Sequence, residues 1–242
     1  MDKVILYFGY VMFFLVCLYL IFALCSYLLI SLGETLKKIK YNKNNLKDNS
    51  QTLNFNKKRN PIKSLIMNAY EGLYRMLVFK TGRIPLNWLR KWIYKHVFKM
   101  NIEKNVVIHK GLEIRGGYKI YIGKGTIIGD DCLLDGRGGL EIGQNVNFSS
   151  RACIYTMQHD YQSHDFAGIS GKVTIGDRAW ISCNTTLLPG VNISKNCVVA
   201  AGAVVSKDLK ESGLYGGIPA KLLKERTNNL DYEFKGGSCW FY

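Results

Sequence analysis

The stretch from Met157 to Phe166, MQHDYQSHDF, contains two His-Asp pairs whose histidines lie five residues apart. The chain has only four histidines, so this stretch holds half of them. Imidazole and carboxylate side chains supply either acid–base catalysis or ligands for a metal ion. A solvated polar loop is the third alternative. The elements that position His159 and His164 decide between the three.

The spacing disfavours a metal site. Neighbouring residues of a strand point to opposite sides, so His159-Asp160 and His164-Asp165 do not place four ligands on one face of a regular element. No cysteine or further histidine flanks the stretch. We therefore expect no bound metal.

A period of six residues follows Asn101. Neither a helix nor a strand alternation has this period, but a solenoid does, because three short strands close one coil of about 18 residues. Each strand then buries one large side chain, and small residues follow at the corners. The recurring apolar positions are Ile108, Ile114, Ile120, Ile122, Ile128, Leu134, Leu140, Ile142, Phe148, Ile154, Ile175, Ile181, Leu187, Ile193, Val199 and Val205.

The count is interrupted between Ile154 and Ile175, where 21 residues exceed one coil. The chain must leave the solenoid there in a loop. His159 lies where this loop begins and the rigid coil still holds the backbone, whereas His164 lies further out. Because catalytic groups need accurate placement, His159 is the candidate base and His164 a candidate substrate contact or solvated residue.

A second irregularity lies at Leu134-Asp-Gly-Arg-Gly-Gly-Leu140, where the count slips by two residues. Such a slip predicts a bulge that opens a pocket wall. Asp135 and Arg137 would then bind polar groups of a substrate or form a structural turn. Either Asp135, Asp160 or a backbone carbonyl is expected to orient the ring of His159.

Four motifs resemble the hexapeptide-repeat acyltransferases. They are Ile175-Gly-Asp-Arg-Ala-Trp-Ile181, Leu188-Pro-Gly-Val191, Val199-Ala-Ala-Gly-Ala-Val-Val-Ser-Lys-Asp208 and Gly216-Gly-Ile-Pro-Ala-Lys221. The similarity is greatest to the maltose and galactoside O-acetyltransferases and to polysaccharide-biosynthesis acetyltransferases. It implies a left-handed parallel β-helix, a homotrimer with active sites between subunits, and acetyl-coenzyme A as donor. It also implies that His159, in Thr156-x-x-His159, is the general base.

The same resemblance implies a coenzyme site, to which the backbone N–H of Cys183 would contribute oxyanion stabilisation. The family often has serine at the position of Cys183 and arginine at that of Lys224, so the chain departs from the pattern there. The implied coenzyme contacts are Cys183, Ala201, Ser206, Lys207 and Lys224.

The N-terminal segment predicts a membrane anchor, because no charged residue occurs from Val4 to Leu32 and about 20 apolar residues span a bilayer. The formal charge is +15, and residues 33–110 hold 18 Lys/Arg against 4 Asp/Glu. A basic block suits nucleic acid or an anionic membrane surface, and the apolar segment favours the membrane. Lysines directly after the segment place the remaining chain in the cytoplasm.

These patterns divide the chain into five parts. The part before the solenoid has amphipathic helical spacing with Trp88, Trp92 and interspersed Lys/Arg, which suits packing against the main domain, a membrane surface, or both. The seven cysteines show no CxxC spacing and suit a reducing compartment. The expected parts are a transmembrane anchor (1–32), a basic flexible linker (33–60), an amphipathic helical segment (61–101), the β-helix (102–225) and a C-terminal tail (226–242).

Together these features predict a membrane-anchored O-acetyltransferase that acts on a saccharide hydroxyl, such as a surface-glycan or lipid-linked precursor. N-acetylation of an amino sugar and acyl transfer to a lipid or small-molecule hydroxyl stay open as alternatives. So does a solenoid scaffold or binding module without catalysis. We expect coenzyme A, a saccharide and the membrane as partners, and no nucleic acid.

Overall fold

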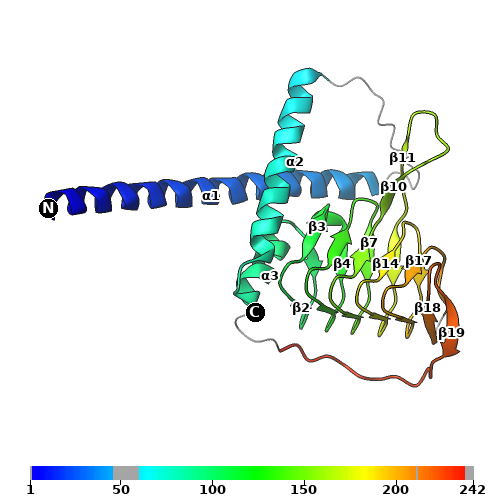
Figure 1. Cartoon of the computed structure of the whole chain (residues 1–242). Helices are drawn as coiled ribbons and strands as arrows, with labels where there is room; N and C mark the ends of the chain where they lie inside the picture. Colours follow the sequence, from blue (N-terminus) through cyan, green and yellow to red (C-terminus); the bar gives the residue numbers. More distant parts are fainter. Residues whose placement is uncertain (1, 46–59, 211, 238–242) are drawn as a thin grey trace.

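The computed structural model describes residues 2–45, 60–210 and 212–237. It shows a β-solenoid of about six coils preceded by three helices, which gather around the first coils (Figure 1). The helices are α1 (Asp2–Asn45), α2 (Pro61–Gly82) and α3 (Asn87–His96). The six-residue period therefore predicted the solenoid correctly.

Three sheets form the walls of the solenoid, and each of the first five coils adds one strand to each sheet. Sheet 1 contains β1 (Asn101–Ile102), β4 (Ile120–Ile122), β7 (Leu140–Ile142), β12 (Val173–Ile175) and β15 (Asn192–Ile193). Sheet 2 contains β2 (Val107–Ile108), β5 (Ile127–Ile128), β8 (Asn147–Phe148), β13 (Trp180–Ile181), β16 (Val198–Val199), β18 (Gly213–Gly216) and the antiparallel β19 (Lys221–Glu225). Sheet 3 contains β3 (Glu113–Arg115), β6 (Leu133–Asp135), β9 (Cys153–Ile154), β14 (Thr186–Leu187) and β17 (Val204–Val205).

The recurring apolar residues stack in register inside the solenoid. In sheet 2, Ile108, Ile128, Phe148, Ile181 and Val199 are paired from coil to coil, and all are fully buried. A continuous aliphatic column of this kind is the main source of stability of a solenoid. Each coil therefore holds the next one in a fixed position.

The long helix α1 has two halves with different surroundings. Residues 9–25 are exposed or half-exposed on all sides, whereas Ser26, Ile30 and Glu34 are buried at four-residue steps. One face of the second half therefore packs against the protein. The helix continues to Asn45, so residues 33–45 are helical rather than part of a flexible linker, because this packing extends the helix beyond the apolar run. Residues 46–59 of the expected linker lie outside the described residues.

The helices α2 and α3 carry apolar side chains both for packing against the solenoid and for contact with a membrane surface. Leu77 and Ile93 are buried in the common core, but Leu65, Trp88 and Trp92 are exposed. The amphipathic segment thus packs on the solenoid with one face and leaves large apolar side chains on the other.

The C-terminal tail returns along the corner between sheets 1 and 2 toward the first coils (Figure 1). The Arg178 guanidinium donates to the carbonyl of Tyr232 (3.1 Å), and the Phe234 N–H donates to the amide oxygen of Asn145 (2.9 Å). Lys124 forms an ion pair with Glu233 (3.4 Å). The described part of the tail therefore connects several coils instead of capping the last one.

Candidate active site

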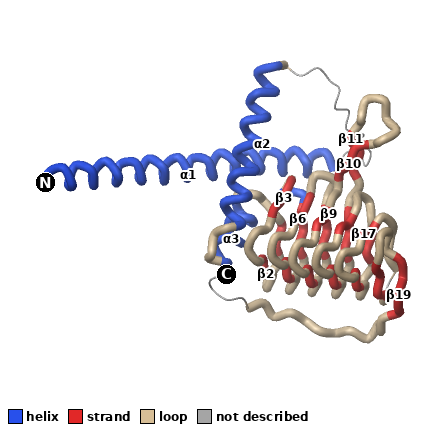
Figure 2. The backbone as a smooth tube through the Cα atoms, in the orientation of Figure 1, coloured by secondary structure: helices blue, strands red, loops and turns tan. Residues whose placement is uncertain are grey.

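The chain leaves the solenoid between β9 and β12, where the six-residue count breaks. It forms the antiparallel hairpin of β10 (Met157–His159) and β11 (Gly168–Ser170), which projects from the solenoid wall (Figure 2). His159 is the last residue of β10 and pairs with Gly168. The first strand of the hairpin thus carries the candidate base only five residues beyond the buried Ile154.

The ring of His159 is fixed by Phe166. Nδ1 of His159 lies 2.8 Å from the carbonyl oxygen of Phe166, and the two rings stack with centroids 4.1 Å apart at an angle of 9°. A carbonyl oxygen only accepts hydrogen bonds, so Nδ1 carries the proton. Nε2 of the neutral imidazole is then unprotonated and can accept a proton.

The neighbouring polar residues of the hairpin have other partners. The carboxylate of Asp160 accepts the Gln162 N–H (3.0 Å) and shapes the turn. Asp165 is bonded to Ser163, and His164 is exposed at the hairpin tip. Of the three orienting groups left open by the sequence, the structure therefore shows a backbone carbonyl at the ring nitrogen.

Asp135 and Arg137 form a rigid connection beneath the hairpin. The guanidinium of Arg137 donates to both oxygens of the fully buried Asp135 (2.9 Å each). These hydrogen bonds raise the pKa of Arg137. Asp135 also accepts the N–H of Thr156 (3.3 Å), and the Thr156 hydroxyl accepts the N–H of Gly138 (2.8 Å). A Cβ at Gly138 would clash with the Thr156 carbonyl, so the glycine permits this close approach.

The five implied coenzyme residues lie in three places. Cys183 and Ala201 occupy equivalent corners between sheets 2 and 3 on successive coils, where the Gly202 N–H donates to the Cys183 carbonyl (2.9 Å). Ser206 and Lys207 follow β17 at the other edge of sheet 3, and Lys224 lies on β19. All except the half-buried Cys183 are exposed.

In this chain, His159 and Cys183 lie beyond opposite edges of sheet 3. His159 follows β9 on the side of Ser206, and Cys183 precedes β14. Among the described residues, no group of three His, Cys, Asp or Glu side chains could hold a metal ion.

Comparisons with known proteins agree with this architecture. A family model of bacterial transferase hexapeptide repeats (six repeats) matches residues 172–207. The chain is 32% identical over 131 residues to WcaF of Escherichia coli, whose name describes a colanic acid biosynthesis acetyltransferase. The matched residues cover 54% of this chain and 72% of that protein. The chain belongs to the hexapeptide-repeat acetyltransferase family.

Two solved structures extend the family comparison. A maltose O-acetyltransferase from Clostridium difficile superposes with a TM-score of 0.53 at 26% identity, over 64% of this chain and 87% of that one. A hexapeptide-repeat acetyltransferase from Vibrio cholerae, solved with acetyl-coenzyme A, superposes with a TM-score of 0.57 at 23% identity, over 66% and 90%. The resemblance inferred from the four motifs is thereby confirmed.

Phe166 is the residue of this site that sequence reasoning missed. It lies in the left-handed region (φ 51°) and its side chain is 62% exposed. A bulky residue in that conformation is unusual and marks a constrained position. Its only sequence signal is the distance of seven residues from His159, and that does not reveal a hairpin contact.

Proposed function

We propose that this hexapeptide-repeat acetyltransferase transfers an acetyl group from acetyl-coenzyme A to a saccharide hydroxyl, on a surface-glycan or lipid-linked precursor. The observation that carries the proposal is the pairing of His159 Nδ1 with the Phe166 carbonyl, which leaves Nε2 free as a base. The acetyl-coenzyme A bound to the Vibrio cholerae relative supports the choice of donor.

In this mechanism Nε2 of His159 removes the hydroxyl proton while the acceptor oxygen attacks the thioester carbonyl. The C–S bond then breaks, and the imidazolium returns the proton to the departing coenzyme A thiolate. The backbone N–H of Cys183 stabilises the oxyanion of the tetrahedral intermediate. Asp135 and Arg137 act as positioning residues through Thr156.

The coenzyme lies in the groove between adjacent β-helices, with Cys183 and Ala201 from one edge of sheet 3 and Ser206 and Lys207 from the other edge, on the side of His159. Lys207 and Lys224 meet its phosphate groups. Since His159 leaves from the edge opposite Cys183, one site needs His159 of one subunit and Cys183 of another. We therefore propose a homotrimer of left-handed β-helices. Sedimentation velocity of the solubilised protein tests this, and a monomer at working concentration would contradict it.

We also propose that the exposed half of α1 is a transmembrane anchor with the solenoid on the cytoplasmic side. By length and composition α1 is able to cross a membrane. The lysines after residue 36 support this orientation. The acceptor would then be reached at the cytoplasmic face of the membrane.

Thiol release from acetyl-coenzyme A, with a panel of p-nitrophenyl glycosides as acceptors, tests the function. The variant His159→Ala should lower kcat by about 10²–10⁴-fold and leave the KM for acetyl-coenzyme A nearly unchanged. His96→Ala, on α3, is the matched control. Full turnover of His159→Ala would exclude its role as base, and absence of a thermal shift with acetyl-coenzyme A would exclude the donor.

A further inference from the structure

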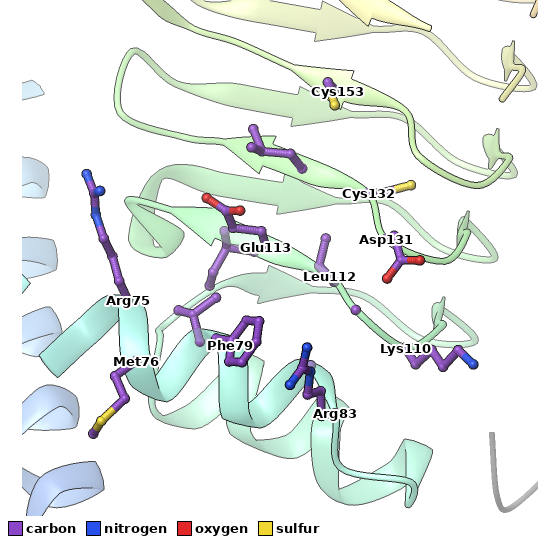
Figure 3. Close-up of a pocket in the computed structure, with 15 residues that line it drawn as sticks. Arg75, Met76, Phe79, Arg83, Lys110, Leu112, Glu113, Asp131, Cys132 and Cys153 are labelled. Carbon is purple, nitrogen blue, oxygen red and sulfur yellow. The ribbon is translucent and has the colours of Figure 1, made fainter. Parts of the chain in front are cut away.

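A cavity of about 930 Å³ lies between the C-terminal half of α2 and the first strands of sheet 3 (Figure 3). Its walls include Met76 and Phe79 from α2, and Leu112 and Leu133 from the solenoid. Apolar walls of this size suit an alkyl chain, because burying methylene groups is favourable.

Two arginines border this apolar space, Arg75 within α2 and Arg83 directly after its last residue, Gly82. Arg75 and Phe79 project from α2 (Figure 3), and the Arg83 guanidinium lies 3.8 Å from the centroid of the Phe79 ring. In the part of the chain that the structure describes, neither Arg75 nor Arg83 forms a salt bridge. An anionic group would complement them.

A smaller polar cavity of about 260 Å³ shares Arg75 and Ile114 with the apolar one. Together the two cavities are bordered by six Lys/Arg and four Asp/Glu side chains. Glu34 lies at the polar cavity, fully buried, and its Oε2 has no hydrogen-bond partner in the described structure. An unpaired buried carboxylate oxygen is costly, so a hydroxyl donor from a ligand would stabilise it.

The helix α2, which forms one wall of the apolar cavity, contacts α1 through other side chains. Thr81 of α2 shares a hydrogen bond with Tyr27 (3.1 Å), and Lys80 donates to the hydroxyl of Tyr19 (3.4 Å). Both tyrosines belong to the uncharged run of α1. The helix α2, and with it the cavity between α2 and sheet 3, therefore lies near the boundary of the membrane proposed above.

The polar cavity lies on the side of His159. Its lining residues Gly116 and Arg137 follow β3 and β6, at the edge of sheet 3 from which the chain continues after β9 to His159. Arg137 borders the polar cavity, and its partner Asp135 accepts the N–H of Thr156, just before β10. A ligand that fills both cavities thus extends to the edge of sheet 3 at which the chain enters β10.

We propose that these joined cavities bind a long-chain lipid phosphate, with the alkyl chain between α2 and sheet 3, the phosphate at Arg75 and Arg83, and an attached sugar in the polar cavity. This rests on the proposed function, and it makes the carrier lipid a recognised part of the acceptor. Acceptors would then arrive laterally from the membrane instead of from solution.

The test uses the full-length protein in phosphatidylcholine nanodiscs and dodecyl phosphate with a terminal diazirine as photoreactive probe. Mass-spectrometric mapping should locate the label on cavity residues of α2 or sheet 3. Arg75→Ala should weaken labelling at least tenfold, Arg75→Lys should retain most of it, and Leu133→Trp should abolish it by filling the space. Lys104→Ala, on the far corner of the first coil, should label like the parent.

Several results would overturn the proposal. The first two are equal labelling by the corresponding diazirine dodecanol and displacement of the dodecyl phosphate probe by excess inorganic phosphate alone. The other two are probe labelling confined to residues 9–25 and cross-links that show a second copy of the chain in the cavity. Thermal shifts with coenzyme A on the same sample separate the two hypotheses. Coenzyme binding without specific labelling would contradict only the proposed lipid site. Specific labelling without coenzyme binding would contradict only the assignment of acetyl-coenzyme A as donor.

Discussion

At the scale of single residues, the two His-Asp pairs are unequal because the hairpin gives only one histidine a fixed ring. His159 is held by a hydrogen bond and by stacking on Phe166, whereas His164 lies exposed at the tip. A base must present one nitrogen in one tautomer before the acceptor arrives. For His159 as the proposed base, the Phe166 carbonyl meets this need without a carboxylate, and Asp160 and Asp165 bond within the turn.

Asp135 is the residue whose loss should disturb both stability and catalysis. Asp135→Ala leaves the Arg137 guanidinium and the Thr156 N–H without their acceptor. We expect about 2 kcal/mol of destabilisation, less than for a fully buried pair because Arg137 is 40% exposed. Urea unfolding measures this loss. The kcat should fall with the acetyl-coenzyme A KM unchanged, because β10 loses its support.

Glu141→Ala is the matched control for that experiment. Its ion pair with Lys172 (2.6 Å) is exposed on both sides and should contribute less than about 1 kcal/mol. Equal destabilisation by the two substitutions would show that the Asp135 connection is an ordinary surface pair.

The cysteines should differ in their reaction with iodoacetamide. Burial raises the pKa of Cys132 to about 12, so only about one thiol in 10⁴ is ionised at pH 8. Its labelling should be negligible there and increase about tenfold per pH unit. Cys183, half-buried at the coil corner, should react faster, and coenzyme A should slow its reaction. Mass spectrometry checks both, with urea-unfolded protein as control; rapid labelling of native Cys132 at pH 8 would contradict the structure.

At the scale of elements, the six-residue count was sufficient to predict the coils and the loop. Each short strand buries a large apolar side chain, so the buried positions recur at a fixed spacing in the sequence. The count could not predict the hairpin contact of Phe166, which depends on the turn inside the loop, nor the continuation of α1 to Asn45, which depends on the burial of Ile30 and Glu34. The slip at Asp135 was recognised, but its partner Thr156 lies one coil away. Long-range hydrogen bonds of this kind have no period in the sequence.

The tail is an element whose role is testable by truncation. Deleting residues 228–242 removes the hydrogen bonds of Arg178 to Tyr232 and of Asn145 to Phe234. Each is worth about 1 kcal/mol, so Tm should fall by several degrees while the β-sheet circular dichroism spectrum is retained. Tyr232→Phe removes only one donor and should give a smaller shift. An unchanged Tm for the truncated protein would show that the tail contributes nothing to stability.

At the scale of the whole molecule, α1 has an exposed part and a part that packs on the protein. Its first 24 helical residues span about 36 Å, enough for the hydrocarbon core of about 30 Å, and the burial pattern changes at Ser26. A span over the full uncharged run to Leu32 would place packed residues such as Ile30 in the bilayer. The proposed anchor would therefore end before the charged residues begin, at the point where α1 starts to pack on the protein.

Two deletions separate anchoring from packing. Removing residues 2–25 should release the protein from membranes without loss of fold, because those side chains are exposed where they are described. Removing residues 2–41 should destabilise the protein by several kcal/mol. This deletion removes the fully buried Ile30 and also Glu34, which accepts a hydrogen bond from Tyr70 of α2. Membrane fractionation and thermal unfolding measure the two effects. If the shorter deletion still sediments with membranes at high salt, the exposed Trp88 and Trp92 hold the protein there, and α1 is not its sole anchor.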